Sequence, residues 1–195
     1  MPLRKIMIID GHPDPNEERF CHALVNSYAL AASGAGHTIR RVTLAGVNVP
    51  FVRSEAEWEQ ESVPADLTEA QEGIRWADHL VLVYPLWLGT MPALLQAFLE
   101  QVLRPGFAVA PRDRNFDRGL LQSKSARIVV TMGMPAMLFR VFILAQNLMV
   151  PSRNVLHVAG IRPVVATLIG DVGGIDDARR RRWLARIERL GRRGV

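Results

Sequence analysis

The sequence is poor in cysteine and has no long apolar run. Cys21 is its only cysteine, which rules out a disulfide framework within the chain and disfavours thiolate metal clusters. No stretch reaches the roughly 18 apolar residues of a membrane-spanning helix. The first ten residues hold only a short apolar segment, 6–9, and lack the small-residue cleavage site of a signal peptide. These absences predict a cytoplasmic protein with no stable membrane insertion.

Common enzyme fingerprints are also missing. The chain contains no G-x-G-x-x-G, Walker A or G-x-S-x-G sequence, and no His/Cys cluster with metal-ligand spacing. Several frequent enzyme classes are therefore excluded. The sequence predicts no metal site, and it identifies no catalytic acid–base pair.

Charge is unevenly distributed along the chain. The net charge is +5, and arginines crowd the C-terminal segment 179–193. A basic tail attracts nucleic acid or anionic lipid. We favour a simpler interpretation, a terminal helix with a solvated basic face whose arginines suit the negative end of the helix dipole. No nucleic-acid partner is expected.

Short apolar segments alternate with helical patterns along the chain. The predicted strands are Arg4–Asp10, His37–Leu44, His79–Tyr84, Ala126–Met132 and Pro163–Ile169. The first predicted helix has apolar residues at helical spacing from Phe20 to Ala31 and is stopped by Gly34 and Gly36. The other predicted helices are Leu67–Ala77, Met91–Leu103, Pro135–Met149, Ser152–Ala159 and Asp176–Arg193. Residues 45–65 show no periodicity, and 105–124 is expected to be a long loop.

This alternation predicts one α/β domain over residues 1–195. Its expected fold is flavodoxin-like, a five-stranded parallel sheet of order 2-1-3-4-5 with helices on both faces. Ligands of such sheets bind beyond the carboxyl ends of the strands, near the point where the strand order reverses. The loops after the first, third and fourth strands are therefore the candidate site.

The first loop leads into a helix N-terminus, which attracts phosphate through unpaired N–H groups. His12 and Arg19 add donors, and Asn16 is a candidate N-cap. The loop also carries acidic residues, among them Asp14, that would repel a phosphate unless they point outward. An ordinary capped helix with no ligand fits these residues equally well, so this loop alone leaves both interpretations open.

The loops after the third and fourth strands offer complementary surfaces. Pro85-Leu86-Trp87 would supply an apolar wall for a flat heteroaromatic ring, unless Trp87 is simply buried in a proline-bounded turn. In Thr131-Met132-Gly133-Met134, the glycine allows close approach of backbone to a ligand. Successive N–H groups there would stabilise an anion.

Taken together, these residues resemble the flavodoxin-like NAD(P)H:quinone oxidoreductases, the family of DT-diaphorase and the bacterial modulators of drug activity. The resemblance extends over almost the whole chain. Its marks are Gly11-His12-Pro13-Asp14-Pro15 followed by Phe20, Pro85-Leu86-Trp87 followed by Met91-Pro92-Ala93-Leu94-Leu95, Gly119-Leu120-Leu121 with Lys124, and Thr131-Met132-Gly133-Met134-Pro135. The Pro-Leu-Trp segment is the most specific of these.

The resemblance implies a cofactor site and an activity. By this likeness, the flavin phosphate would lie among His12, Arg19, Phe20 and Cys21. The isoalloxazine ring would meet Pro85, Leu86, Trp87 and Leu88, and its N1–O2 edge would be bordered by Thr131, Met132, Gly133 and Met134. Family members are typically homodimers that transfer hydride from NAD(P)H to flavin and then to a quinone.

Two departures separate this chain from the family pattern. Arg19-Phe20-Cys21 stands where the family often has Ser-Phe-Asn, and Met137-Leu138-Phe139-Arg140 stands where a bacterial branch has Trp-Tyr-Tyr-Arg. Because the departures follow that bacterial branch, FMN is favoured over FAD. The almost wholly apolar segment 135–149 is expected at the dimer interface.

The resulting prediction is an FMN-dependent NAD(P)H oxidoreductase with a quinone-like acceptor. Two alternatives from other classes stay open at this point. The chain would also suit a flavin-binding regulatory subunit of a potassium efflux system, since its missing tyrosines suit docking better than turnover. The other alternative is a flavodoxin fold without flavin that binds nucleic acid through the arginine tail.

Overall fold

The computed structural model describes residues 2–59, 62–110, 119–135, 137 and 151–195. Its five strands form one sheet in the order β2-β1-β3-β4-β5, with every neighbouring pair parallel. The strands are β1 (Lys5–Asp10), β2 (Thr38–Thr43), β3 (His79–Pro85), β4 (Ser125–Thr131) and β5 (Val164–Ile169). The predicted fold class and strand order are confirmed.

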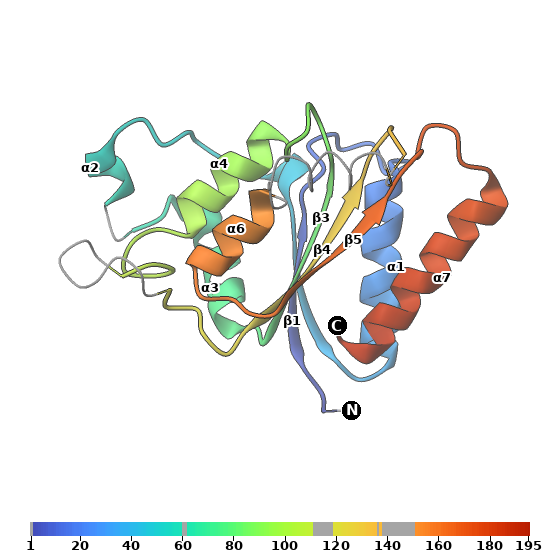
Figure 1. Cartoon of the computed structure of the whole chain (residues 1–195). Helices are drawn as coiled ribbons and strands as arrows, with labels where there is room; N and C mark the ends of the chain where they lie inside the picture. The colour runs from blue at the N-terminus through green and yellow to red at the C-terminus, as the bar shows by residue number, and fades with distance from the viewer. Residues whose placement is uncertain (1, 60–61, 111–118, 136, 138–150) are drawn as a thin grey trace.

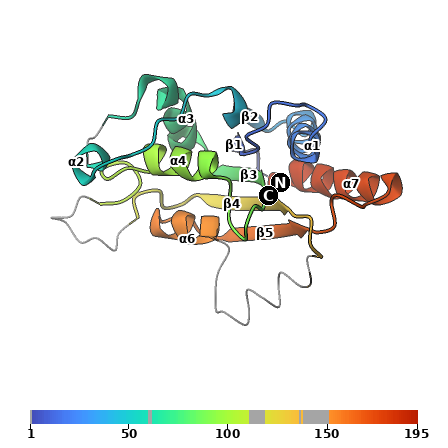
Figure 2. The same ribbon diagram turned by 90° about the horizontal axis from the view of Figure 1, so that it is seen from above.

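Helices cover both faces of the sheet (Figures 1 and 2). One face packs against α1 (Phe20–Gly34) and α7 (Asp177–Arg193), and the other against α3 (Ala65–Trp76), α4 (Ala93–Val102) and α6 (Pro151–Val158). β1 shows why its sequence is continuously apolar. Ile6 and Ile8 join the core under α1 and α7, whereas Met7 and Ile9 join the core under α3 and α4. Each of these four side chains is therefore buried on one face or the other.

Two short helices occupy part of the region in which no periodicity was recognised. They are the 3₁₀ helix η1 (Leu44–Gly46) and α2 (Glu55–Trp58), whose N-cap Ser54 accepts a hydrogen bond from the N–H of Glu57. Helices this short complete at most about one turn, so they leave no hydrophobic period to read. The predicted helix Pro135–Met149 lies almost entirely outside the described residues.

No helix of the described residues is long and apolar enough to cross a membrane. The C-terminal arginines lie on α7, as predicted, and several of them are exposed. Asp176 caps this helix by accepting a hydrogen bond from the N–H of Arg179 at 2.6 Å. α7 packs along α1 (Figure 1).

The close packing of α7 on α1 depends on Gly191. A Cβ atom at this position would lie 2.5 Å from the carbonyl oxygen of Tyr28. Backbone therefore lies against backbone at this crossing, and any larger residue must separate the two helices. By contrast, a Cβ atom added to Gly34, the last residue of α1, would meet nothing within 4 Å.

We expect Gly191→Ala to lower the free energy of unfolding by about 2 kcal/mol, since the added methyl overpacks a rigid backbone contact. The matched change Gly34→Ala should instead raise it by about 0.5 kcal/mol, because alanine reduces the entropy of the unfolded chain without a clash. Urea denaturation of both variants measures the difference. Equal effects would show that the α1–α7 crossing tolerates a side chain.

Candidate functional site

The loops that follow β1, β3 and β4 are held together at the carboxyl edge of the sheet. The N–H of Gly11 donates to the carbonyl of Val83 at 2.8 Å, which joins the first loop to β3. The N–H of Leu86 donates to the carbonyl of Thr131 at 2.7 Å, which joins the third-strand loop to β4. The structure thus brings the predicted loops together at one edge.

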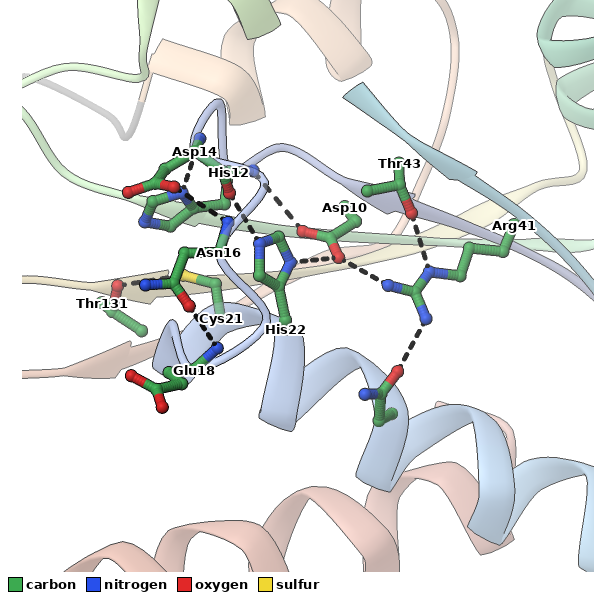
Figure 3. A network of polar contacts seen from close by, with 11 residues as sticks. Asp10, His12, Asp14, Asn16, Glu18, Cys21, His22, Arg41, Thr43 and Thr131 are labelled. Carbon is green, nitrogen blue, oxygen red and sulfur yellow. Dashed lines mark hydrogen bonds and ion pairs between the residues drawn. The ribbon is translucent and has the colours of Figure 1, made fainter. Parts of the chain in front are cut away.

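Side chains within the first loop fix its own backbone. His12 Nδ1, Asp14 Oδ1 and Asn16 Oδ1 each accept a hydrogen bond from the N–H two residues later, at 3.1, 2.9 and 3.0 Å (Figure 3). Such local turns compete with helix formation and delay its start. Helix α1 consequently begins at Phe20.

The predicted N-cap role of Asn16 is wrong. Its side chain is committed to the N–H of Glu18, and the N-cap position is taken by Arg19 in extended backbone. No side chain among the described residues caps α1, and its first turn carries no acidic residue. The helix therefore presents uncapped N–H groups and the positive end of its dipole at this edge.

Arg19 forms an ion pair with Asp14 across the first loop. Nη2 and Nε of the guanidinium lie 2.6 and 2.7 Å from Asp14 Oδ2. The hydrogen bond from the Asn16 N–H, followed by Arg19, lowers the pKa of the Asp14 carboxyl below its usual value. The acidic residue that seemed to oppose phosphate binding is thus balanced by the neighbouring arginine.

Phe20 and Cys21 open α1, and their side chains contact residues of α7 and β4. The Arg180 guanidinium lies over the Phe20 ring, 5.4 Å from its centroid. Cys21 is buried, and its Sγ shares a hydrogen bond with Thr131 Oγ1 at 3.2 Å. Burial raises the pKa of this thiol to about 12. Cys21 therefore ties the first turn of α1 to the end of β4 as a neutral thiol.

A buried charge cluster lies beneath the first loop, and the sequence analysis missed it. Asp10, the last residue of β1, is fully buried, and its Oδ2 contacts His22 Nδ1 at 2.7 Å and Arg41 Nη2 at 2.8 Å (Figure 3). The available signal was a carboxylate that ends an apolar strand at the ligand-binding edge. Such a group requires partners from elsewhere in the fold when it is buried.

His12 connects the first loop to the third-strand loop. Its ring centroid lies 5.3 Å from that of His22 and 6.1 Å from that of Trp87, with the Trp87 ring nearly perpendicular. Burial, followed by the nearby His22, lowers the pKa of His12. His12 is therefore a neutral ring at neutral pH, and its Nδ1 is occupied by the Asp14 N–H.

The third-strand loop ends in a tight turn with exposed apolar side chains. Trp87 and Thr90 exchange both backbone hydrogen bonds, at 2.9 and 3.0 Å, around Leu88 and Gly89. Leu88 has a φ of +50° and a fully exposed side chain. A left-handed leucine is strained by about 1 kcal/mol or more. Trp87 is 48% exposed, so the alternative that this turn buries it is wrong.

The fourth-strand loop passes from buried to exposed residues at Gly133. Met132 is buried and its N–H pairs with the carbonyl of Ile169 at 2.9 Å, so this amide is not available to an anion. Gly133 is exposed, and a Cβ built on it would meet nothing within 4 Å. Neither packing nor a left-handed backbone requires glycine at this position. An open space therefore borders the loop where close approach to a ligand was predicted.

The family model described as the flavodoxin-like fold matches residues 4–190 of this chain. The chain belongs to this family. This membership agrees with the resemblance drawn from the loop motifs, and the strand order observed here is the one expected of the fold. Among the described residues, no cluster of three or more His, Cys, Asp or Glu side chains could hold a metal ion.

The chain is similar to several proteins named as quinone oxidoreductases. The human ribosyldihydronicotinamide dehydrogenase [quinone] is 34% identical over 68% of this chain and 65% of its own length. The FMN-dependent NADH:quinone oxidoreductase 1 of Hahella chejuensis is 29% identical over 84% of this chain and 83% of its length. The structure of an NAD(P)H:quinone oxidoreductase from Methanothermobacter marburgensis matches with a TM-score of 0.77 at 23% identity, covering 98% of this chain and 96% of that one.

We expect Cys21 to resist thiol reagents in the folded protein. A pKa of about 12 in place of the ordinary 9.0 leaves about a thousandfold less thiolate at pH 8, and burial adds a steric barrier. Because Cys21 is the only cysteine, reaction with a chromogenic disulfide reports on it alone. Labelling should be at least about a hundredfold slower than in urea. Rapid labelling of folded protein would contradict the Cys21–Thr131 contact.

Proposed function

We propose that this protein is an FMN-dependent NAD(P)H:quinone oxidoreductase with one flavin site in a single domain. The observation that carries the proposal is the juxtaposition of the uncapped α1 N-terminus, the half-exposed Trp87 and the open space at Gly133. These features suit, in turn, a phosphate, an aromatic ring and the edge of that ring. The FMN-dependent and quinone-reducing activities named for the relatives support the same reaction.

The described residues fit such a cofactor. His12 and Arg19, with the backbone N–H groups of Phe20 and Cys21, would hold the phosphate at the helix N-terminus. The ring would lie against the loop residues Pro85, Leu86, Trp87 and Leu88. Its N1–O2 edge would lie along Thr131, Met132, Gly133 and Met134, where Gly133 and Met134 are the remaining candidates for backbone donors.

When bound, FMN supplies the hydride-transfer chemistry of the reaction. The chain's own residues bind and orient it. Trp87 and Leu88 present apolar surface that excludes water, and the Trp87–Thr90 hydrogen bonds keep this surface in place. The Cys21–Thr131 contact and the Leu86–Thr131 hydrogen bond keep the loops at a constant separation. Their preformed geometry lowers the entropic cost of binding a rigid ring.

We further propose that the protein is a homodimer. In the part of the chain that the structure describes, an apolar hollow of about 370 Å³ lies between α4 and α6, and Met137 and Val158 are mostly exposed. Apolar surface of this kind is covered in most soluble proteins. The predicted interface segment, including Phe142, lies mainly outside the described residues. Sedimentation at micromolar concentration tests the proposal, and a monomer there would refute it.

We expect the apoprotein to bind about one FMN per chain and then to reduce a quinone with NADH or NADPH. Gly133→Val should weaken binding at least about tenfold, because its side chain occupies the open space bordering the ring. Gly46→Val is the control, since it also meets open space but lies outside these loops. Flavin absorbance and fluorescence titration measure both. Absence of micromolar affinity for FMN would overturn the proposed function.

We expect Arg19→Ala to weaken the binding of FMN about tenfold and to change the binding of riboflavin much less. A charged hydrogen bond contributes roughly 1.5–3 kcal/mol, and the lower end applies because this side chain is half exposed and shared with Asp14. Arg182→Ala removes an exposed arginine from α7 and serves as the control for net charge. Equal losses for FMN and riboflavin would show that Arg19 does not contact the phosphate.

A further inference from the structure

The buried carboxylate of Asp10 joins three elements. Besides His22 of α1 and Arg41 of β2, it faces the N–H of His12 at 3.5 Å. Arg41 is itself oriented by Asn26 Oδ1 at 2.7 Å and Thr43 Oγ1 at 3.1 Å (Figure 3). Removing either partner of this buried carboxylate would leave an uncompensated charge and destabilise the fold. The three elements are therefore held in one arrangement.

His22 is held between two acceptors. Its Nδ1 faces the Asp10 carboxylate at 2.7 Å, and its Nε2 faces the main-chain carbonyl of Asp14 at 2.8 Å. A carbonyl oxygen only accepts hydrogen bonds, so both ring nitrogens donate and the geometry is that of an imidazolium. A neutral ring has one N–H and keeps only one of the two contacts.

Asp14 is the residue through which this contact reaches the candidate phosphate site. Its carbonyl accepts from His22, its N–H donates to His12 Nδ1, and its carboxylate pairs with Arg19. The N–H donated to Nδ1 places the proton of the neutral His12 ring on Nε2. One residue therefore sets the tautomer of His12 and the position of Arg19 together.

We propose that Asp10 and His22 are positioning residues for phosphate recognition, acting through Asp14 on His12 and Arg19. This inference rests on the proposed FMN site and adds to it the groups that hold its donors in place. The role is expected to show in the preference for FMN over riboflavin, because the two ligands share the ring and differ in the phosphate. It does not require either residue to touch the cofactor.

The charged groups that contact one another around His22 include one more cation than carboxylate. The cluster contains the carboxylates of Asp10 and Asp14 and the cations of Arg19, Arg41 and His22, with His12 as a neutral ring. The guanidinium of Arg180 from α7 lies over the ring of Phe20, the first residue of α1.

The test compares FMN and riboflavin affinities of the apoprotein by fluorescence titration. His22→Gln keeps one donor and loses the charge, and Asp10→Asn removes the counter-ion. We expect each to weaken FMN about tenfold and riboflavin less than about twofold. The double variant places two neutral amides side by side. Its loss of FMN affinity should be no larger than that of either single variant, as expected of residues that act through one contact.

A matched control separates positioning from general damage. His37→Gln removes another histidine that is buried with both nitrogens in contact, but His37 faces Arg4 and Arg192 at the other end of the sheet. We expect this variant to keep the FMN-to-riboflavin affinity ratio of the unaltered protein. A fall in this ratio equal to that of His22→Gln would overturn the positioning role.

Each outcome decides one claim. If the unaltered protein binds neither FMN nor riboflavin, both the proposed function and this inference are wrong. If it binds FMN but the variants keep its affinity, or lose FMN and riboflavin equally, the positioning role is overturned and the flavin site stands. If a single variant fails to fold, the other single variant and the double variant decide the question.

Discussion

Burial of the Asp10 carboxylate at the end of β1 is the constraint on which the geometry of the candidate site depends. A charge without solvent must be matched by cations that the fold brings to it. Arg41 comes from the edge strand β2 and His22 from the first turn of α1. The same contacts therefore fix the strand end, the helix start and the loop between them.

The other two loops are positioned by backbone and by one side-chain contact. Thr131 connects them, since its carbonyl accepts a hydrogen bond from the N–H of Leu86. Its hydroxyl also contacts Cys21 of α1. Leu88 is exposed and has a strained, left-handed backbone. Such strain persists only where the surrounding structure enforces it. An apolar side chain held outward beside Trp87 suits a surface that contacts a ring or a second subunit.

Much of the fold could be predicted from local patterns. Continuous apolar runs such as Ile6–Ile9 identified strands that are buried on both faces, and their alternation with helices led to the observed strand order. The three loops followed from the topology, since parallel strands end at one edge. The prediction for Asn16 failed because a short turn of side chain to backbone competed with capping, and sequence spacing alone does not decide between them.

The sequence by itself determined the strands, most of the helices and the chemical character of the three loops, because each depends on residues that are close in the chain. Only the tertiary structure decided which side chains meet. Cys21 and Thr131 are 110 residues apart, and Asp10 and Arg41 are 31 apart. Their contacts depend on the crossing of helices over the sheet and on burial, which local periodicity does not encode. Asp10 therefore looks like an ordinary strand end in the sequence and becomes the centre of a buried charge cluster only when the chain is folded.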